Sequence, residues 1–200
     1  MTKQAIHGLI LAGGSSSRMG TDKSRINYHG HEQREFLAEL LGKFCSKVFI
    51  SCKVGQEIPD YLNALHDQLD LQSPLNGIVS AFRSNSDCAW LIVAVDMPLV
   101  DEQVIAYLIR NRDESVVATC YMDSVGEMPE PLLSIWEPKV SSKLESFISS
   151  GGVSPRQFLI DNHCKTIKID DASKLTNINT SKDLLNFRIQ QQNLHKKRQD

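Results

Sequence analysis

The residues with the clearest chemical potential lie in a loop between residues 13 and 23. Gly13 and Gly14 follow an apolar run, and adjacent glycines let a backbone turn sharply and bring its N–H groups against an anion. Ser15–Ser17 add hydroxyl donors, while Arg18 and Lys23 add two cations. Arginine clamps phosphate oxygens with paired hydrogen bonds, and lysine acts as a mobile point charge. The loop therefore predicts a triphosphate site.

This glycine loop, residues 11–23, differs from two common phosphate-binding motifs. The pattern Gly-x-x-x-x-Gly-Lys-Ser/Thr of the P-loop is absent, and so is the dinucleotide pattern Gly-x-Gly-x-x-Gly. Glycine and serine are also common in ordinary surface turns, so a loop with incidental charges is the alternative. A position directly after a buried strand favours binding, because loops held at strand ends often carry binding residues.

A second candidate is Asp96, which follows the apolar run from Ala89 to Val95. Its carboxylate is expected at the carboxyl edge of the sheet, on the same rim as Gly13 and Lys23. Magnesium usually takes one or two protein carboxylates and completes its shell with water and phosphates. Asp96 is therefore our candidate for holding Mg²⁺, with a simple turn-capping role as the alternative.

Short strand-like runs alternate with amphipathic helical runs, and this order must position both loops. Strands are expected at 6–12, 48–51, 89–95, 116–120, 132–135 and 166–169, and helices at 32–44, 101–109, 138–150, from 154 and from 180. Asp101 is expected to cap its helix, and Thr180–Asp183 fits a capping box. The run at 89–95 is apolar at every position, which is typical of a strand covered on both faces. We therefore expect an α/β fold, a three-layer sandwich around a Rossmann-like, mostly parallel sheet.

Charge and apolar run length give no indication of a nucleic-acid-binding protein or a membrane-spanning protein. The 200 residues carry a formal charge of −2, so nothing indicates a nucleic-acid partner. The longest apolar run, from Cys88 to Val95, is far shorter than the roughly 20 residues of a membrane span. We expect one domain over residues 1–190, a polar tail over residues 191–200 and a cytoplasmic location, with no secretory signal.

The cysteines and histidines carry no site prediction. Five dispersed cysteines without a Cys-x-x-Cys pair indicate reduced thiols. The pair His29 and His31 lacks the three or four ligands that zinc needs.

Four motifs together resemble one family, the nucleotidyltransferases that include molybdenum cofactor guanylyltransferase. The glycine loop matches the pattern Leu-x-Gly-Gly-x-Ser-x-Arg-Met-Gly-x-Asp-Lys, with alanine at position 12. Ser73–Gly77 resembles the Gly-Pro-Leu-x-Gly segment, Asp96–Pro98 the Asp-x-Pro segment, and Asn177–Thr180 the Asn-x-Asn-Thr turn. Their order and their spread over most of the chain make the resemblance specific, and it implies the fold of the nucleotide-diphospho-sugar transferases.

The resemblance implies a reaction in which the phosphate of Mo-molybdopterin attacks the α-phosphorus of GTP. The products are molybdopterin guanine dinucleotide and pyrophosphate. It also implies Mg²⁺ as cofactor and transient contact with other proteins of molybdenum cofactor biosynthesis. The catalytic residues expected are Arg18, Lys23 and Asp96, which act by alignment and charge neutralisation.

Binding residues are expected on both sides of the reacting phosphate. The nucleotide set consists of Leu11, Ala12, Gly13, Gly14, Ser15, Lys23, Asp70 and Asp96. Asp70 is assigned to the nucleoside by the resemblance, and Asp67 is the alternative because it lies one turn earlier if the segment is helical. The acceptor set consists of Arg156, Asn177 and Asn179, although an exposed arginine and ordinary turn chemistry explain these residues as well.

Three other functions remain open at the level of sequence. A related enzyme with this architecture uses CTP with the pterin, and another joins a nucleotide to a sugar phosphate. A nucleotide sensor without catalysis is the third alternative. It is disfavoured by the presence of Arg18, Lys23 and Asp96 together.

Overall fold

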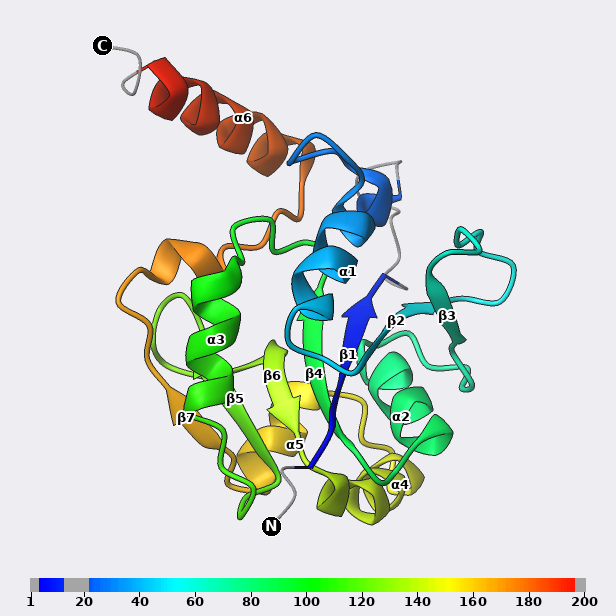
Figure 1. Ribbon diagram of the computed structural model, residues 1–200. Helices are drawn as coiled ribbons and strands as arrows, with labels where there is room; N and C mark the ends of the chain where they lie inside the picture. Colours follow the sequence, from blue (N-terminus) through cyan, green and yellow to red (C-terminus); the bar gives the residue numbers. More distant parts are fainter. Residues whose placement is uncertain (1–3, 13–21, 197–200) are drawn as a thin grey trace.

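The computed structural model describes residues 4–12 and 22–196, with side chains described up to residue 189 (Figure 1). Within these residues, one seven-stranded sheet has the order β3-β2-β1-β4-β6-β5-β7. The strands are β1 (Ile6–Leu11), β2 (Lys47–Cys52), β3 (Asn63–His66), β4 (Ala89–Ala94), β5 (Ala118–Met122), β6 (Pro129–Trp136) and β7 (Lys165–Ile167). Only β6 runs antiparallel to its neighbours, so the predicted mostly parallel sheet is confirmed.

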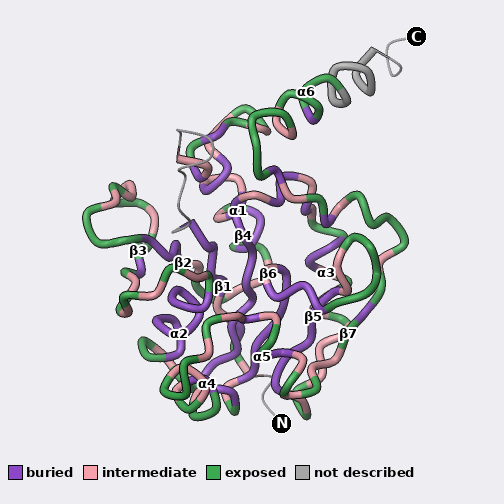
Figure 2. Tube along the Cα trace, turned by 180° about the vertical axis from the view of Figure 1, so that it is seen from behind, coloured by how far each residue is buried: buried purple, intermediate pink, exposed green. Residues whose placement is uncertain are grey.

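Helices cover both faces of the sheet, which gives three layers (Figures 1 and 2). The α-helices are α1 (Gln33–Gly42), α2 (Leu75–Ser84), α3 (Glu102–Arg110), α4 (Ser141–Ser149), α5 (Pro155–Asp161) and α6 (Ser181–Lys196), and the 3₁₀ helices are η2 (Lys23–Arg25), η3 (Pro138–Val140) and η4 (Ala172–Leu175). Helices α1 and α3 lie on one face, while α2, α4 and α5 lie on the other. The predicted three-layer sandwich is therefore confirmed.

The central strand β4 is buried along its whole length, because helices pack on both of its faces. Trp90 faces Phe82 of α2, with ring centroids 6.5 Å apart. On the neighbouring strand β6, Trp136 stacks on Phe158 of α5 at 5.4 Å. These aromatic contacts hold α2 and α5 against the same face of the sheet.

Side-chain caps begin several helices where the sequence predicts them. The Asp101 carboxylate accepts a hydrogen bond from the Val104 N–H at 3.0 Å, and Ser154 caps α5 through the Gln157 N–H. At α6, the Thr180 hydroxyl accepts from the Asp183 N–H, and the Asp183 carboxylate accepts from the Thr180 N–H. This reciprocal pair is the predicted capping box.

The edge strand β3 and the helix α2 were not predicted from the sequence. Helix α2 lies tight against the sheet at Gly77. A Cβ there would lie 2.3 Å from Ser51 Oγ and 2.7 Å from Leu11 Cδ2, so only glycine allows this approach.

Helix α6 leaves the body of the molecule and projects outward (Figure 1). It continues past residue 190, where the sequence predicts the start of a polar tail, up to Lys196. No helix in the described part of the chain is long and apolar enough to cross a membrane.

Candidate active site

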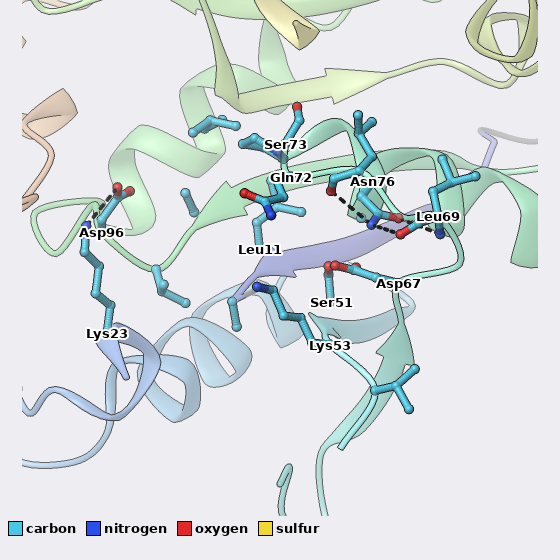
Figure 3. A pocket seen from close by; sticks show the side chains of 18 of the residues that line it. Leu11, Lys23, Ser51, Lys53, Asp67, Leu69, Gln72, Ser73, Asn76 and Asp96 are labelled. Atoms are coloured by element: carbon cyan, nitrogen blue, oxygen red, sulfur yellow. Dashed lines mark hydrogen bonds and ion pairs between the residues drawn. The ribbon is translucent and has the colours of Figure 1, made fainter. Parts of the chain in front are cut away.

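A pocket of about 510 Å³ opens at the carboxyl edge of the sheet, where β1, β2 and β4 end (Figure 3). Ligands of open α/β sheets bind at this edge. The walls come from the strand ends, from the segment before α2 and from Lys23. The lining residues are Leu11, Ala12, Lys23, Ser51, Lys53, Val54, Asp67, Leu69–Pro74, Asn76, Gly77, Ala94–Asp96 and Leu132. We call this pocket the crevice.

One end of the crevice holds a cation between two oxygen-bearing side chains. The Lys23 ammonium lies 3.9 Å from Asp96 Oδ2 (Figure 3). It also donates a hydrogen bond to Asn179 Oδ1 at 2.9 Å. Asp22 positions the lysine, because its carboxylate accepts from the Ser24 N–H and caps the short helix η2. The structure thus brings together Lys23, Asp96 and Asn179, three residues selected from separate motifs.

Asp96 is a buried carboxylate with unused hydrogen-bonding capacity. Its side chain is 16% exposed, and no residue in the described part of the chain donates a hydrogen bond to its buried Oδ1. Burial raises the pKa of Asp96, while the nearby Lys23 charge opposes the rise. A buried anion that is only partly neutralised is suited to receive a further cation.

The turn Thr176–Thr180, which we call the C-terminal turn, is fixed against this end of the crevice. The Ile178 N–H donates to the Asp96 carbonyl oxygen at 2.7 Å. Beyond the turn, the ring of Phe187 packs edge-on against Tyr28 with centroids 5.3 Å apart. The last part of the chain therefore holds both Asp96 and the segment that follows Lys23.

The other end of the crevice is formed by Ser51, Lys53 and Asp67 (Figure 3). The Ser51 hydroxyl donates to Asp67 Oδ1 at 2.8 Å. Burial raises the pKa of Asp67, while the Ser51 hydrogen bond and the Lys53 charge oppose the rise. This end presents a held carboxylate and a cation to a ligand in the crevice.

The helical segment considered for residues 67–70 is wrong. Asp67 directly follows β3, and the chain then runs without helix until α2 begins at Leu75. Both Asp67 and Asp70 line the crevice, but Asp70 is exposed, whereas Asp67 is half-buried and hydrogen-bonded. The geometry thus gives Asp67 a fixed carboxylate at the sheet edge.

Arg156 lies outside the residues that line the crevice, in the first turn of α5. Its guanidinium contacts Glu130 Oε2 at 3.4 Å and Asp123 Oδ2 at 3.7 Å. Burial raises the pKa of Glu130, and the negative charge of Asp96 adds to the rise, while Arg156 opposes it. Arg156 and Asp96 therefore belong to one group of interacting charges.

Several residues predicted for the site either lie outside the described residues or do not line the crevice. Gly13, Gly14, Ser15 and Arg18 lie outside the described residues. Asn177 is described and lies in the C-terminal turn, but it does not line the crevice. Leu11 and Ala12, by contrast, line the crevice.

The structure adds residues that sequence reasoning missed, chiefly Ser51, Lys53 and Glu130. Ser51 and Lys53 flank the end of a predicted strand, so a systematic check of every strand end is the signal for them. The signal for Glu130 is a carboxylate between two prolines, within the mostly apolar run 128–136.

No cluster of three or more histidine, cysteine or acidic residues within the described ranges has the geometry of a metal site. His29 bonds to the Pro98 carbonyl oxygen at 2.9 Å, and all five cysteines are free.

Comparisons with known proteins place the chain in a family. The family model of the MobA-like NTP transferase domain matches residues 8–166. A molybdenum cofactor biosynthesis bifunctional protein of Synechocystis sp. is 32% identical, over 92% of this chain and 54% of its own length. The chain thus spans about half of that relative. A probable molybdenum cofactor guanylyltransferase of Mycobacterium avium is 26% identical, over 88% of this chain and 92% of its own length.

Solved structures agree on the fold. Molybdopterin-guanine dinucleotide biosynthesis protein A from Archaeoglobus fulgidus has a TM-score of 0.72 at 21% identity, covering 90% of this chain and 96% of its own. A 2-C-methyl-D-erythritol 4-phosphate cytidylyltransferase from Thermus thermophilus has a TM-score of 0.68 at 11% identity, covering 92% and 98%. The fold is that of these nucleotidyltransferases, and the family match over residues 8–166 shows that the chain belongs to the MobA-like NTP transferase family.

Proposed function

We propose that this protein transfers GMP from GTP to the terminal phosphate of Mo-molybdopterin. The observation that carries the proposal is the crevice in which Lys23 and Asp96 meet at the sheet edge, with Asn179 hydrogen-bonded to Lys23. Relatives named as molybdenum cofactor guanylyltransferases support the choice of substrates.

In this proposal, the crevice binds the nucleotide along its length. The backbone after β1, at Leu11 and Ala12 and on through Gly13, Gly14 and Ser15, cradles the phosphates. Lys23 and Arg18 neutralise phosphate charge. We assign the nucleoside contact to Asp67 in place of Asp70, because the Ser51 hydroxyl and the strand end fix the Asp67 carboxylate.

The residues at the Lys23 end fit a magnesium ion. A cationic group of the chain already lies between the oxygens of Asp96 and Asn179, and the buried Asp96 Oδ1 has no partner among the described residues. Asp96 would hold the ion with the phosphates of GTP, since magnesium needs only one or two protein carboxylates. Bound there, Mg²⁺ would offset the charge on the phosphate oxygens.

The proposed chemistry is one displacement at phosphorus. An oxygen of the acceptor phosphate bonds to the α-phosphorus of GTP, and the bond from that phosphorus to the α–β bridging oxygen breaks. Pyrophosphate leaves with the bonding electron pair. The acceptor phosphate is already anionic at neutral pH, so the chain supplies alignment and positive charge, and no strong general base is needed.

The acceptor is placed beyond Asp96, toward Arg156 and the C-terminal turn. Arg156 offers a guanidinium with a 41% exposed side chain, which suits a phosphate group. Asn177 and Asn179 offer amide groups from the same side. Asn179 contacts Lys23 beside Asp96, and Arg156 contacts Glu130, and we assign both to the acceptor side of the site.

We further propose a cytoplasmic protein with its catalytic domain over residues 1–190 and a polar segment over residues 191–200. Five free thiols support a reducing compartment. We also propose transient contact with other proteins of molybdenum cofactor biosynthesis or with acceptor proteins.

Mass spectrometry of one reaction tests the proposal. The mixture contains protein, molybdopterin, molybdate, Mg²⁺ and all four nucleoside triphosphates, and a parallel mixture contains sugar phosphates as acceptors. We expect the guanine dinucleotide of molybdopterin and pyrophosphate. A cytosine dinucleotide or a nucleotide sugar as the main product contradicts the proposal, and so does tight GTP binding without product, which indicates a sensor.

A further inference from the structure

Glu130 is a buried carboxylate that the proposed mechanism does not yet use. It lies near the start of β6, and its residue is only 6% exposed. Strand β6 runs antiparallel to β4, with Leu133 opposite Val93. Continued by three residues, this register leads from β4 to Asp96 and from β6 to Glu130. The reversed strand is therefore what brings Glu130 to the carboxyl edge of the parallel strands.

An irregularity in β6 helps to aim Glu130 at the site. Cys120 of β5 pairs with Ser134, but the next residue, Tyr121, pairs with Glu130. Three residues of β6 therefore lie outside the β5 ladder between these pairs. Bulges of this kind redirect side chains and are frequent next to active sites.

The Glu130 carboxylate is held on one side and contacts Arg156 on the other. Oε1 accepts a hydrogen bond from the Leu132 N–H at 3.0 Å, and Leu132 itself lines the crevice. Oε2 accepts from Arg156 Nη2 at 3.4 Å. Asp123 adds a longer contact, 3.7 Å from its Oδ2 to Arg156 Nη1. One guanidinium thus bridges two carboxylates that are each largely buried.

We propose that Glu130 is a positioning residue that holds the guanidinium of Arg156 toward the phosphate of the acceptor. This inference rests on the proposed function, because it assigns a supporting residue to the acceptor side of the same site. Arg156 keeps further N–H donors that neither carboxylate uses, and these donors are available to a phosphate.

The charge of Glu130 matters for two physical reasons. An arginine side chain has many rotamers, and a fixed carboxylate reduces the conformational freedom that acceptor binding must otherwise remove. The guanidinium also lies against both Glu130 and Asp123, so it offsets their charges at the place where an anionic acceptor arrives. A neutral residue at position 130 weakens the hold on Arg156 and leaves Asp123 as its remaining carboxylate partner.

The main experiment compares Glu130→Gln with Glu127→Gln, a matched loss of charge at an exposed glutamate of the same hairpin. Steady-state kinetics are measured with varied Mo-molybdopterin at saturating GTP, together with the equilibrium Kd for GTP. We expect Glu130→Gln to raise the KM for the acceptor about tenfold, the order set by one charge-assisted hydrogen bond. The kcat and the Kd for GTP stay within about threefold of wild type, a split that indicates lost acceptor binding.

A double-variant cycle separates positioning from a general structural role. In an Arg156→Ala background, Glu130→Gln is expected to change the acceptor KM no further, because its target is gone. An unchanged acceptor KM in the single variant overturns the inference. So does a rise of the same size in the Arg156→Ala background, or an equal effect of Glu127→Gln.

Crystal structures of wild type and Glu130→Gln keep this inference distinct from the proposed function. We expect the Arg156 guanidinium to leave its wild-type position in the variant, while the backbone of α5 stays in place. An unmoved guanidinium overturns the inference even if the enzyme is active. If the wild-type protein forms no guanine dinucleotide, the proposed function fails, whereas the Arg156 position still decides whether Glu130 holds it.

Discussion

The backbone N–H of Ile178 donates a hydrogen bond to the carbonyl oxygen of Asp96, with 2.7 Å between the two atoms. This bond ties the C-terminal turn to the end of the central strand. The next residue, Asn179, then meets the Lys23 ammonium at 2.9 Å. The arrangement of Lys23 and Asp96 therefore depends on a segment more than 80 residues after Asp96.

Lys23→Ala is expected to lower turnover at saturating GTP by at least about 10²-fold, the order found when one preorganised electrostatic donor is removed. The physical reason is the loss of a cation that the structure holds at the phosphate end of the crevice. Pyrophosphate release measures the effect. Lys168→Ala, at an exposed lysine, is the matched control and keeps wild-type turnover. Near-normal turnover of Lys23→Ala would show that the role assigned to Lys23 is wrong.

Asp96→Asn is expected to separate activity from stability. Turnover falls by at least about 10²-fold because the carboxylate that neutralises a cation is lost. The unfolding free energy at pH 7 rises, because a buried charge whose pKa is raised destabilises the folded state when ionised.

The pH dependence of this gain has a defined sign. Wild-type Asp96 titrates near its ordinary value of 3.8 when unfolded and above it when folded. As pH rises through that window, the unfolding free energy of the wild type falls relative to that of Asp96→Asn. Below pH 3.8 this difference between the two proteins disappears. Urea titrations of both proteins at several pH values measure this difference in unfolding free energy. An Asp96→Asn variant less stable than wild type at pH 7 would contradict the prediction.

Asp67→Asn and Asp70→Asn are a matched pair that tests the assignment of the nucleoside contact. We expect Asp67→Asn to raise the KM for GTP about tenfold, the order set by one hydrogen bond to a charged group. Asp70→Asn changes it less than about threefold, since the exposed Asp70 has no fixed partner among the described residues. A larger rise in the KM for GTP in Asp70→Asn than in Asp67→Asn would assign the nucleoside contact to Asp70.

Gly77→Ala is expected to destabilise the protein by about 1–3 kcal/mol, the usual cost of adding a carbon to a packed site. The new Cβ would lie 2.3 Å from Ser51 Oγ, so Ser51 must move and its bond to Asp67 is disturbed. Gly42→Ala, in a helix position with open space, is expected to stabilise by up to about 1 kcal/mol. Urea denaturation compares the two, and equal stabilities would contradict the packing seen at Gly77.

The parts of the fold that the sequence predicts are those with strong local signals. Strand β4 is buried along its whole length, so its apolar run marks it without help from the rest of the chain. Asp101 and Thr180 act through residues only three positions away, and both caps are confirmed. Local hydrogen bonds of this kind can be predicted from short stretches of sequence.

The missed elements have weak local signals. Strand β3 has four residues at an edge of the sheet, and only Leu65 is buried. In helix α2 the polar residues Asn76 and Ser80 are buried together with the apolar ones, so its pattern does not mark a solvent-exposed face. Its Gly77 and the preceding Pro74 also favour a turn when read alone.

The candidate site was predictable where a residue ends a predicted strand, and less so elsewhere. Asp96 directly follows a predicted strand, Lys23 ends the loop that follows another, and the two residues lie 3.9 Å apart. The contact between Arg156 and Glu130 depends on which strands are neighbours and on the reversed direction of β6. Sheet order is set by tertiary packing, so no spacing in the sequence reports it.

The close approach at Gly77 limits how the choice of nucleotide can be re-engineered. The wall formed by Leu11, Ser51 and α2 admits no extra methyl group, so substitutions there disturb the fold before they reshape the space for a base. Lys53 and Gln72 line the same crevice from exposed positions, where side chains change freely. A library aimed at altered base preference should therefore vary these two positions and leave the packed wall intact.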